Sequence, residues 1–377
     1  MISFSGCAVG YADGKLVRSG DDGAFRPSAD LRDLAVPETL TALIAARLDA
    51  LEPAEHRLIA DAAVLGQSFT PTALAAVAGV SEKELEPLLR TLLRREILAL
   101  AADPRRPERG QYAFVQALIR EVAYNTLARR ERRARHLAAA RYFESVESDE
   151  LTGAVAGHLL AAFALSTPGP EADAVGGQSR IALRAAADRA AGLGAQAQSV
   201  AFLEQALTVT REPADEADLR ERAGRSASNA GQHDRAEAFL REALEIRREL
   251  GVPSAIATAT AAPGEVLLLG YRLDAARELL GAWLAMPDPT SDPAGIQIGA
   301  QLAKCFSMFS EAHRAVETAD RVLAAAEEAD MIAIVADTLI TKGGALGDLG
   351  RSYEAIRALR TGLELARSGD MPKTVLR

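Results

Sequence analysis

The chain has 377 residues, with 43 Lys and Arg against 52 Asp and Glu, giving a formal net charge of -9. This length predicts two or three domains, the acidic balance argues against a general binder of nucleic acids or anionic membranes, and two cysteines are too few for a disulfide framework. Hydrophobic residues make up 49% of the chain but aromatic residues only 5%. This alanine-rich composition favours helices packed through small residues over a β-sandwich or barrel.

The sequence shows no targeting or membrane segment. The opening stretch MISFSGCAVGYADGK has neither a basic start nor a sustained apolar run, unlike a secretory signal. No apolar run reaches the roughly 18 residues that a membrane helix needs. We therefore expect a cytoplasmic protein, or a cytoplasmic piece of a larger one, that does not contact membranes.

Residues 1–36 are irregular. Two short apolar pieces flank a Ser-Gly-Asp-Asp-Gly turn at 19–23, which predicts a small β-hairpin. We interpret 1–36 as the tail of a preceding module rather than as a domain of its own.

Residues 37–145 have the helical period. Apolar stripes predict helices over 37–51, 53–66 and 71–79, and a capping box of Ser81 and Glu84 predicts a further helix after residue 81. Two apolar runs around a Pro- and Arg-rich turn at 104–110 predict a β-hairpin. Helices followed by a hairpin are typical of a winged-helix-like domain, and two more helices follow it. Residues 146–179 are predicted to be a helix and a linker, because 166–179 are rich in Ser, Pro and Gly.

Residues 180–377 contain a helical repeat. The pattern small–x3–large–x2–small recurs at a nearly constant step, in Ser199/Leu203/Ala206, Ala236/Leu240/Ala243, Ala275/Leu279/Ala282, Ala315/Ala319/Val322 and Ala355/Leu359/Gly362. A small residue stands twelve positions before the first member in four repeats, at Ala187, Gly224, Ala303 and Gly343. This spacing indicates about five tetratricopeptide (TPR) pairs, truncated at the C-terminus because no polar capping helix follows. The predicted fold is mainly α: a winged-helix-like domain with a small β-hairpin, then a TPR-like α-solenoid.

Catalytic, metal and cofactor motifs are missing from the sequence. No Walker A loop occurs, and a Gly-x-Gly-x-x-Ala string at 192–197 lies between two helices rather than after a strand. The five histidines are scattered, without a His or Cys at metal-ligand spacing. We expect no catalytic residue, no metal site and no cofactor in this chain, which on this reading is not an enzyme.

A basic segment indicates DNA binding as an alternative function of the chain. Residues 81–141 hold 14 basic residues against 8 acidic ones, and the predicted hairpin tip carries candidate phosphate contacts at Arg105, Arg106 and Arg109. Glutamates at 82, 84 and 86 open the candidate recognition helix, however, where they would face phosphates. The competing interpretation is that the segment is a solvated basic patch, or that it packs on acidic parts of the same chain. Nucleic acid is therefore the less favoured partner.

A family resemblance is carried by three segments before the repeats and by two pieces of the repeats, AFLEQALTVT (201–210) and IVADTLITKGGALGDLGR (334–351). VPETLTALIAARLDAL (36–51), DAAVLGQSFT (61–70) and YAFVQALIREVAYNTLARRERRARHLAAA (112–140) resemble the region after the ATPase core in adenylate/guanylate cyclase-like proteins with an AAA/STAND-type ATPase module and a TPR tail. The resemblance implies cyclase and P-loop ATPase domains upstream, and neither is in this chain. On this resemblance, residues 1–36 are the remnant of the preceding ATPase module, including a hairpin. ATP and Mg²⁺ are therefore expected only in that upstream module.

One departure from the family pattern affects a possible nucleotide-sensing position. The family often has His where this chain has Gln116, and in STAND-type switches a winged-helix His can contact the nucleotide phosphate. The resemblance therefore implies Gln116 as that position, where an amide still donates a hydrogen bond but brings no charge.

We expect this chain to be a non-catalytic regulatory region. Its TPR array would bind a protein or peptide on its concave face, and that binding would bias the ATPase and output domains. The alternative is a winged-helix transcriptional regulator with a TPR sensor. The repeat register assigns to the concave face Arg184, Asp188, Asp218, Glu221, Arg225, Gln297, Lys304 and Asp337.

Overall fold

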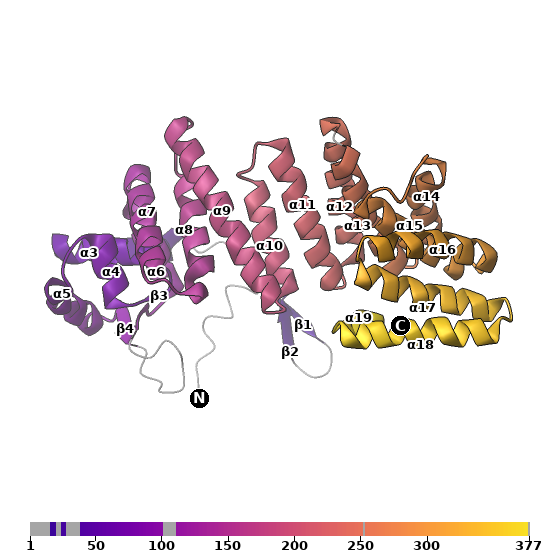
Figure 1. Cartoon of the computed structure of the whole chain (residues 1–377). Helices are drawn as coiled ribbons and strands as arrows, with labels where there is room; N and C mark the ends of the chain where they lie inside the picture. The colour runs from indigo at the N-terminus through magenta and orange to yellow at the C-terminus, as the bar shows by residue number, and fades with distance from the viewer. Residues whose placement is uncertain (1–15, 20–23, 28–37, 101–110, 252, 376–377) are drawn as a thin grey trace. The chain divides into compact units, whose positions relative to one another are not determined.

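The computed structural model describes residues 16–19, 24–27, 38–100, 111–251 and 253–375, and these residues are mostly helical (Figure 1). The chain divides into two compact units, Met1–Ala139 and Ala140–Arg377, which we take in turn.

The first unit begins with the predicted pair of strands. β1 (Leu16–Ser19) and β2 (Ala24–Pro27) run antiparallel, with Leu16 opposite Pro27. The tip of this hairpin, at 20–23, lies outside the described residues.

The rest of the first unit is a helical bundle with a small sheet. Its elements are α2 (Glu38–Asp49), α3 (Pro53–Leu65), β3 (Ser68–Phe69), α4 (Pro71–Ala78), α5 (Glu82–Arg94), β4 (Leu98–Leu100), β5 (Tyr112–Phe114), α6 (Ala117–Thr126) and α7 (Arg129–Ser145), which crosses the boundary between the units. The predicted capping box is present: the Ser81 side chain accepts from the Glu84 backbone N–H, and the Glu84 carboxylate accepts from the Ser81 backbone N–H at 2.8 Å. The Ser81 hydroxyl also donates to this carboxylate at 2.8 Å. Apolar side chains from helices and sheet form one core, with Ile59, Leu74 and Leu85 fully buried.

The sheet has a strand that the sequence did not predict. Its order is β3-β5-β4, with both pairs antiparallel. Gln67 holds β3 against β5: its side-chain Nε2 donates to the Phe114 carbonyl at 2.6 Å, and its own carbonyl accepts from the Phe114 N–H at 2.9 Å. A strand this short has too little periodicity to be detected in advance.

The second unit is a series of antiparallel helices, each packed against the next. They are α8 (Thr152–Ala164), α9 (Pro170–Gly192), α10 (Gln196–Leu207), α11 (Pro213–Asn229), α12 (His233–Leu250), α13 (Pro253–Leu269), α14 (Leu273–Gly281), α15 (Pro293–Met308), α16 (Ala312–Glu328), α17 (Ile332–Asp348), α18 (Ser352–Ser368) and α19 (Pro372–Val375), with short 3-10 turns at Asp149–Leu151 and Ala282–Ala285. We call α9, α11, α13, α15 and α17 the A helices, and α10, α12, α14, α16 and α18 the B helices.

The predicted linker at 166–179 is wrong for most of its length, because α9 begins at Pro170. Proline suits the first helical turn, where its missing N–H has no partner to lose. The glycine at 176 is buried, and a Cβ there would lie 3.0 Å from the Phe163 ring on α8. The composition that resembled a linker therefore serves close packing between two helices.

Small residues on the A helices receive large ones from the B helices. A Cβ at Gly224 would lie 2.4 Å from Leu240 Cγ, and a Cβ at Gly343 would lie 2.6 Å from Leu359 Cγ. Contacts this short require glycine, so the predicted pattern at these repeats corresponds to real helix–helix packing.

The predicted register of the third repeat is wrong by one residue. The buried residues are Ala276, Leu280 and Trp283, rather than Ala275, Leu279 and Ala282. A Cβ at Gly264 would lie 2.5 Å from Leu280 Cδ2, and this glycine and leucine are as far apart in the sequence as Gly224 and Leu240. The repeats therefore begin at Ser199, Ala236, Ala276, Ala315 and Ala355. The pattern misled because Trp283, a large residue, occupies a position that is small in most repeats.

Trp283 is the only tryptophan of the chain and lies in the core of the second unit. Its indole Nε1 donates to the carbonyls of Pro289 (3.0 Å) and Gly295 (2.7 Å), and the Arg321 guanidinium lies over the ring. A buried indole needs such a partner.

Candidate protein-interaction surface

The structure places all eight predicted interaction residues on A helices. They are Arg184 and Asp188 on α9, Asp218, Glu221 and Arg225 on α11, Gln297 and Lys304 on α15, and Asp337 on α17. The repeat period therefore placed all eight residues on one set of helices, and their contact with a partner stays a prediction.

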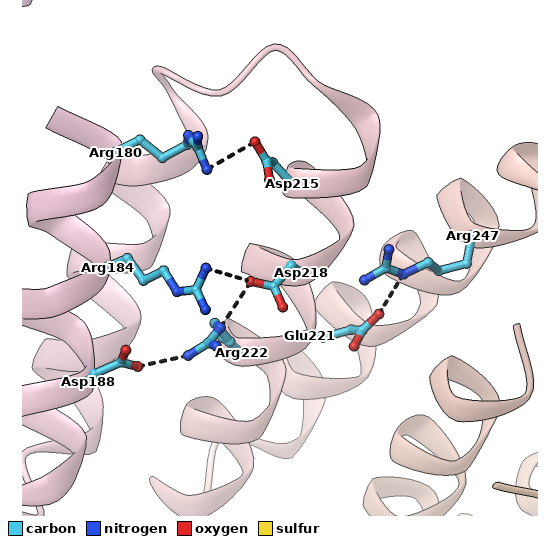
Figure 2. A network of polar contacts seen from close by, with 8 residues as sticks. All are labelled: Arg180, Arg184, Asp188, Asp215, Asp218, Glu221, Arg222 and Arg247. Atoms are coloured by element: carbon cyan, nitrogen blue, oxygen red, sulfur yellow. Dashed lines mark hydrogen bonds and ion pairs between the residues drawn. The ribbon is translucent and has the colours of Figure 1, made fainter. Parts of the chain in front are cut away.

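Several of these residues form ion pairs within the chain (Figure 2). Asp218 accepts from Arg184 at 3.5 Å and from Arg222 at 3.0 Å, and Arg222 also reaches Asp188 at 2.9 Å. A further pair, Arg180–Asp215 at 3.0 Å, joins the same two helices. We call this set the α9–α11 ladder.

Glu221 pairs with Arg247 of α12 at 2.9 Å, and these side chains are only 14% and 19% exposed (Figure 2). Partly exposed pairs like those of the α9–α11 ladder contribute about 0–1 kcal/mol each. The charges of Glu221 and of the α9–α11 ladder are thus already paired within the chain. These pairs connect neighbouring helices and leave little free charge for a partner.

A cavity of about 240 Å³ opens between α11, α13 and α15. Its polar rim includes Arg225 and Glu265, which are exposed, and Gln297, which is half-buried. Its apolar lining includes Ala261, Val266, Leu240 and Leu269. The volume is below the roughly 300–1,000 Å³ of pockets for drug-sized ligands, and it suits a single side chain.

Two residues of α13 that line the cavity were missed by the sequence analysis, although the period could have found them. Glu265 and Leu269 occupy the repeat positions on α13 that Arg225 and Asn229 occupy on α11, and Asn229 also lines the cavity. The error in the register of the third repeat removed α13 from the predicted face. Leu269 is 47% exposed.

Lys304 and Asp337 lie outside this cavity. Both are half-buried and interact with other groups of the chain. The Asp337 backbone carbonyl also accepts from the Thr341 hydroxyl at 3.1 Å. Of the eight predicted residues, the structure therefore brings Arg225 and Gln297 together at a cavity.

In the first unit, Gln116 is exposed and caps the N-terminus of α6, shortly after β5. Its backbone carbonyl accepts from the Ile119 N–H at 3.1 Å. A role in nucleotide sensing stays a prediction.

The candidate DNA contacts Arg105, Arg106 and Arg109 lie outside the described residues. The acidic first turn of α5 is present: Glu84 accepts from the backbone N–H of Ser81 and from its hydroxyl, which lowers the pKa of this carboxyl. A carboxylate held ionised there would repel DNA phosphates. DNA binding stays a prediction, to be tested by a mobility shift with random duplex DNA at low salt.

Other titratable groups in the described part of the chain do not converge on a reaction centre. No group of three or more His, Cys, Asp or Glu residues there has metal-binding geometry, and none of the helices described is long and apolar enough to cross a bilayer. Cys305 is buried, which raises the pKa of its thiol. His158 is buried and stacked on Phe143, and burial lowers its pKa to about 4.

Comparison with known proteins identifies the repeat. Residues 217–250, which span most of α11 and all of α12, match the tetratricopeptide repeat model. The chain contains a TPR. No curated protein matches the sequence.

Several solved structures have similar helical repeats. BtubC from P. vanneervenii shares 17% identity and a TM-score of 0.44, covering 63% of this chain and 92% of its own. A STAND protein with a TPR sensor from Pyrococcus horikoshii shares 12% identity and a TM-score of 0.39, covering 89% and 60%. The Rap conjugation gene regulator of plasmid pLS20, in complex with the Phr* peptide, shares 16% identity and a TM-score of 0.43, covering 65% and 72%. All three scores are below 0.5, so the assignment to TPR repeats rests on the family match and on the glycine–leucine packing.

Proposed function

We propose that this chain is a protein-interaction region that binds a peptide segment of a partner on its A-helix face. The observation that carries the proposal is the cavity lined jointly by α11, α13 and α15. A peptide laid across the successive A helices α11, α13 and α15 contacts all three. The packing of these repeats against one another therefore determines how tightly the peptide binds. Arg225 and Gln297 are the predicted residues assigned to this contact.

The wider role that we propose is regulation of a STAND-type ATPase. Three features support it: the family resemblance of residues 36–51, 61–70 and 112–140, the order of helices and sheet in the first unit, and the TPR match that follows. That order is the one expected of a winged helix. ATP and Mg²⁺ would be bound by the upstream module, and this chain would bias its two states.

Selection from a displayed library of random nine-residue peptides on the immobilised chain tests peptide binding. The variant Gln297→Trp places an indole at the cavity rim and should abolish retention of the selected peptides. Gln205→Trp is the matched control, because Gln205 is an exposed glutamine on the B helix α10. Equal retention by both variants, or no selected peptide, would overturn the proposed site.

Sequencing the genomic DNA upstream of the reading frame tests the wider role. An in-frame Gly-x4-Gly-Lys-Ser/Thr motif before residue 1 is expected. An upstream frame closed by stop codons would refute association with an ATPase in the same polypeptide.

A further inference from the structure

The two charged residues at the cavity rim differ from the other charges near them. Arg180, Arg184 and Arg222 on neighbouring helices all have carboxylate partners. Arg225 and Glu265, by contrast, form no ion pair or hydrogen bond with any part of the chain that the structure describes, nor with each other. Both are exposed, on adjacent A helices, at one cavity.

From these unpaired charges we infer that the partner peptide is extended and carries an acidic and a basic residue close together, the acidic one facing Arg225 and the basic one facing Glu265. This inference rests on the proposed function and names its ligand. A guanidinium favours a carboxylate because its fork matches both oxygens. A lone carboxylate at the other rim favours an ammonium or guanidinium, and it would repel a peptide that is acidic throughout.

Arg225 and Glu265 line one cavity, so the two peptide charges that pair with them should lie close together and on the same side of the peptide. In an extended peptide, side chains at i and i+2 point the same way and lie about 7 Å apart. The acidic and basic residues should therefore be separated by one position.

The other residues that line the cavity indicate the remaining features of the ligand. Ala261, Val266 and Leu240 give an apolar wall, so a small apolar side chain fits the 240 Å³ space. The Gln297 amide can both donate to and accept from a peptide bond. A ligand of this kind has no net charge, in contrast to the wholly acidic or basic peptides that single-sign patches attract.

The test compares peptide pools selected on the wild-type chain, on Arg225→Glu and on Glu265→Lys. Wild-type pools should be enriched in Asp or Glu two positions from Lys or Arg. The Arg225→Glu pool should exchange its acidic preference for a basic one, and the Glu265→Lys pool should do the reverse. Arg360→Glu is the control, since Arg360 is exposed on the B helix α18, and its pool should match wild type.

A synthetic peptide from the wild-type pool should bind Arg225→Glu at least about tenfold more weakly than the control variant. The double variant Arg225→Glu with Glu265→Arg should recover binding to the peptide whose two charges are exchanged. Pools with no charge pair, or with a pair that these substitutions leave unchanged, overturn this inference but leave peptide binding intact. A wild-type chain that selects no peptide overturns both.

Discussion

Replacing Gly343 by alanine adds a methyl group where α17 touches α18. A Cβ at this position would lie 2.6 Å from Leu359 Cγ, 2.8 Å from Leu359 Cδ2 and 3.2 Å from the Ala355 carbonyl oxygen. The next residue, Gly344, is in the same helix, and a Cβ there would meet no atom within 4 Å. The two substitutions are therefore chemically identical and differ only in packing.

The expected magnitudes follow from two opposing effects. Carbon atoms pack best at about 3.5–4.0 Å, so the new methyl overlaps Leu359 by about 1 Å, and overpacking of this kind costs about 1–3 kcal/mol. Alanine in a helix interior gains about 1 kcal/mol over glycine. Gly344→Ala should stabilise by about 1 kcal/mol, while Gly343→Ala should destabilise by about 1 kcal/mol. Their difference cancels the helix propensity and measures packing alone.

Native-state hydrogen exchange, read on peptides from 332–368, gives the free energy of local opening for each variant. A repeat array need not unfold in two states, so a local measurement is preferable to a global midpoint. Equal opening free energies for the two variants would refute the reasoning, because the Leu359 side chain would then move aside without loss of stability. In a Leu359→Ala background the difference between the two glycine substitutions should shrink, since the clashing atoms are gone.

Three other predictions concern buried polar groups. The pKa of His158 is about 4 in the folded chain and about 6.5 for an ordinary histidine. Between pH 6.5 and 4 the unfolded chain therefore binds a proton that the folded chain does not. The free energy of unfolding should fall by about 3 kcal/mol across this range. Urea midpoints across this range should show the slope, and His158→Phe should flatten it. Trp283→Phe leaves two buried carbonyls without their donor and should cost about 1–3 kcal/mol, measured by urea unfolding followed by circular dichroism; an unchanged midpoint would contradict the assigned hydrogen bonds. Arg135→Met removes the guanidinium paired with buried Asp61 and should lower stability by about 3 kcal/mol at pH 7. The loss should shrink in acid, because burial raises the pKa of this carboxyl and protonation removes its charge. A loss independent of pH would argue against an ionised Asp61.

The sequence alone determined the class of fold and the pairing of helices in the repeats. A small residue that recurs at a nearly constant period, opposite a large one on the next helix, is enough to identify paired helices, because only small residues allow their backbones to approach. Capping signals such as Ser81 with Glu84 are local, so they too were predictable. For the same reason, the eight residues chosen from the repeat register all lie on A helices.

Only the tertiary structure decided which charges are paired and where a cavity forms. Arg184 and Arg225 look alike in the sequence, but Arg184 pairs with Asp218 on another helix, whereas Arg225 has no such carboxylate among the described residues. Gly176 is a second example. Its sequence context resembles a linker, but in the structure it packs against the Phe163 ring. Local patterns fix which side of a helix faces inward, whereas pairing and cavities depend on side chains contributed by distant parts of the chain.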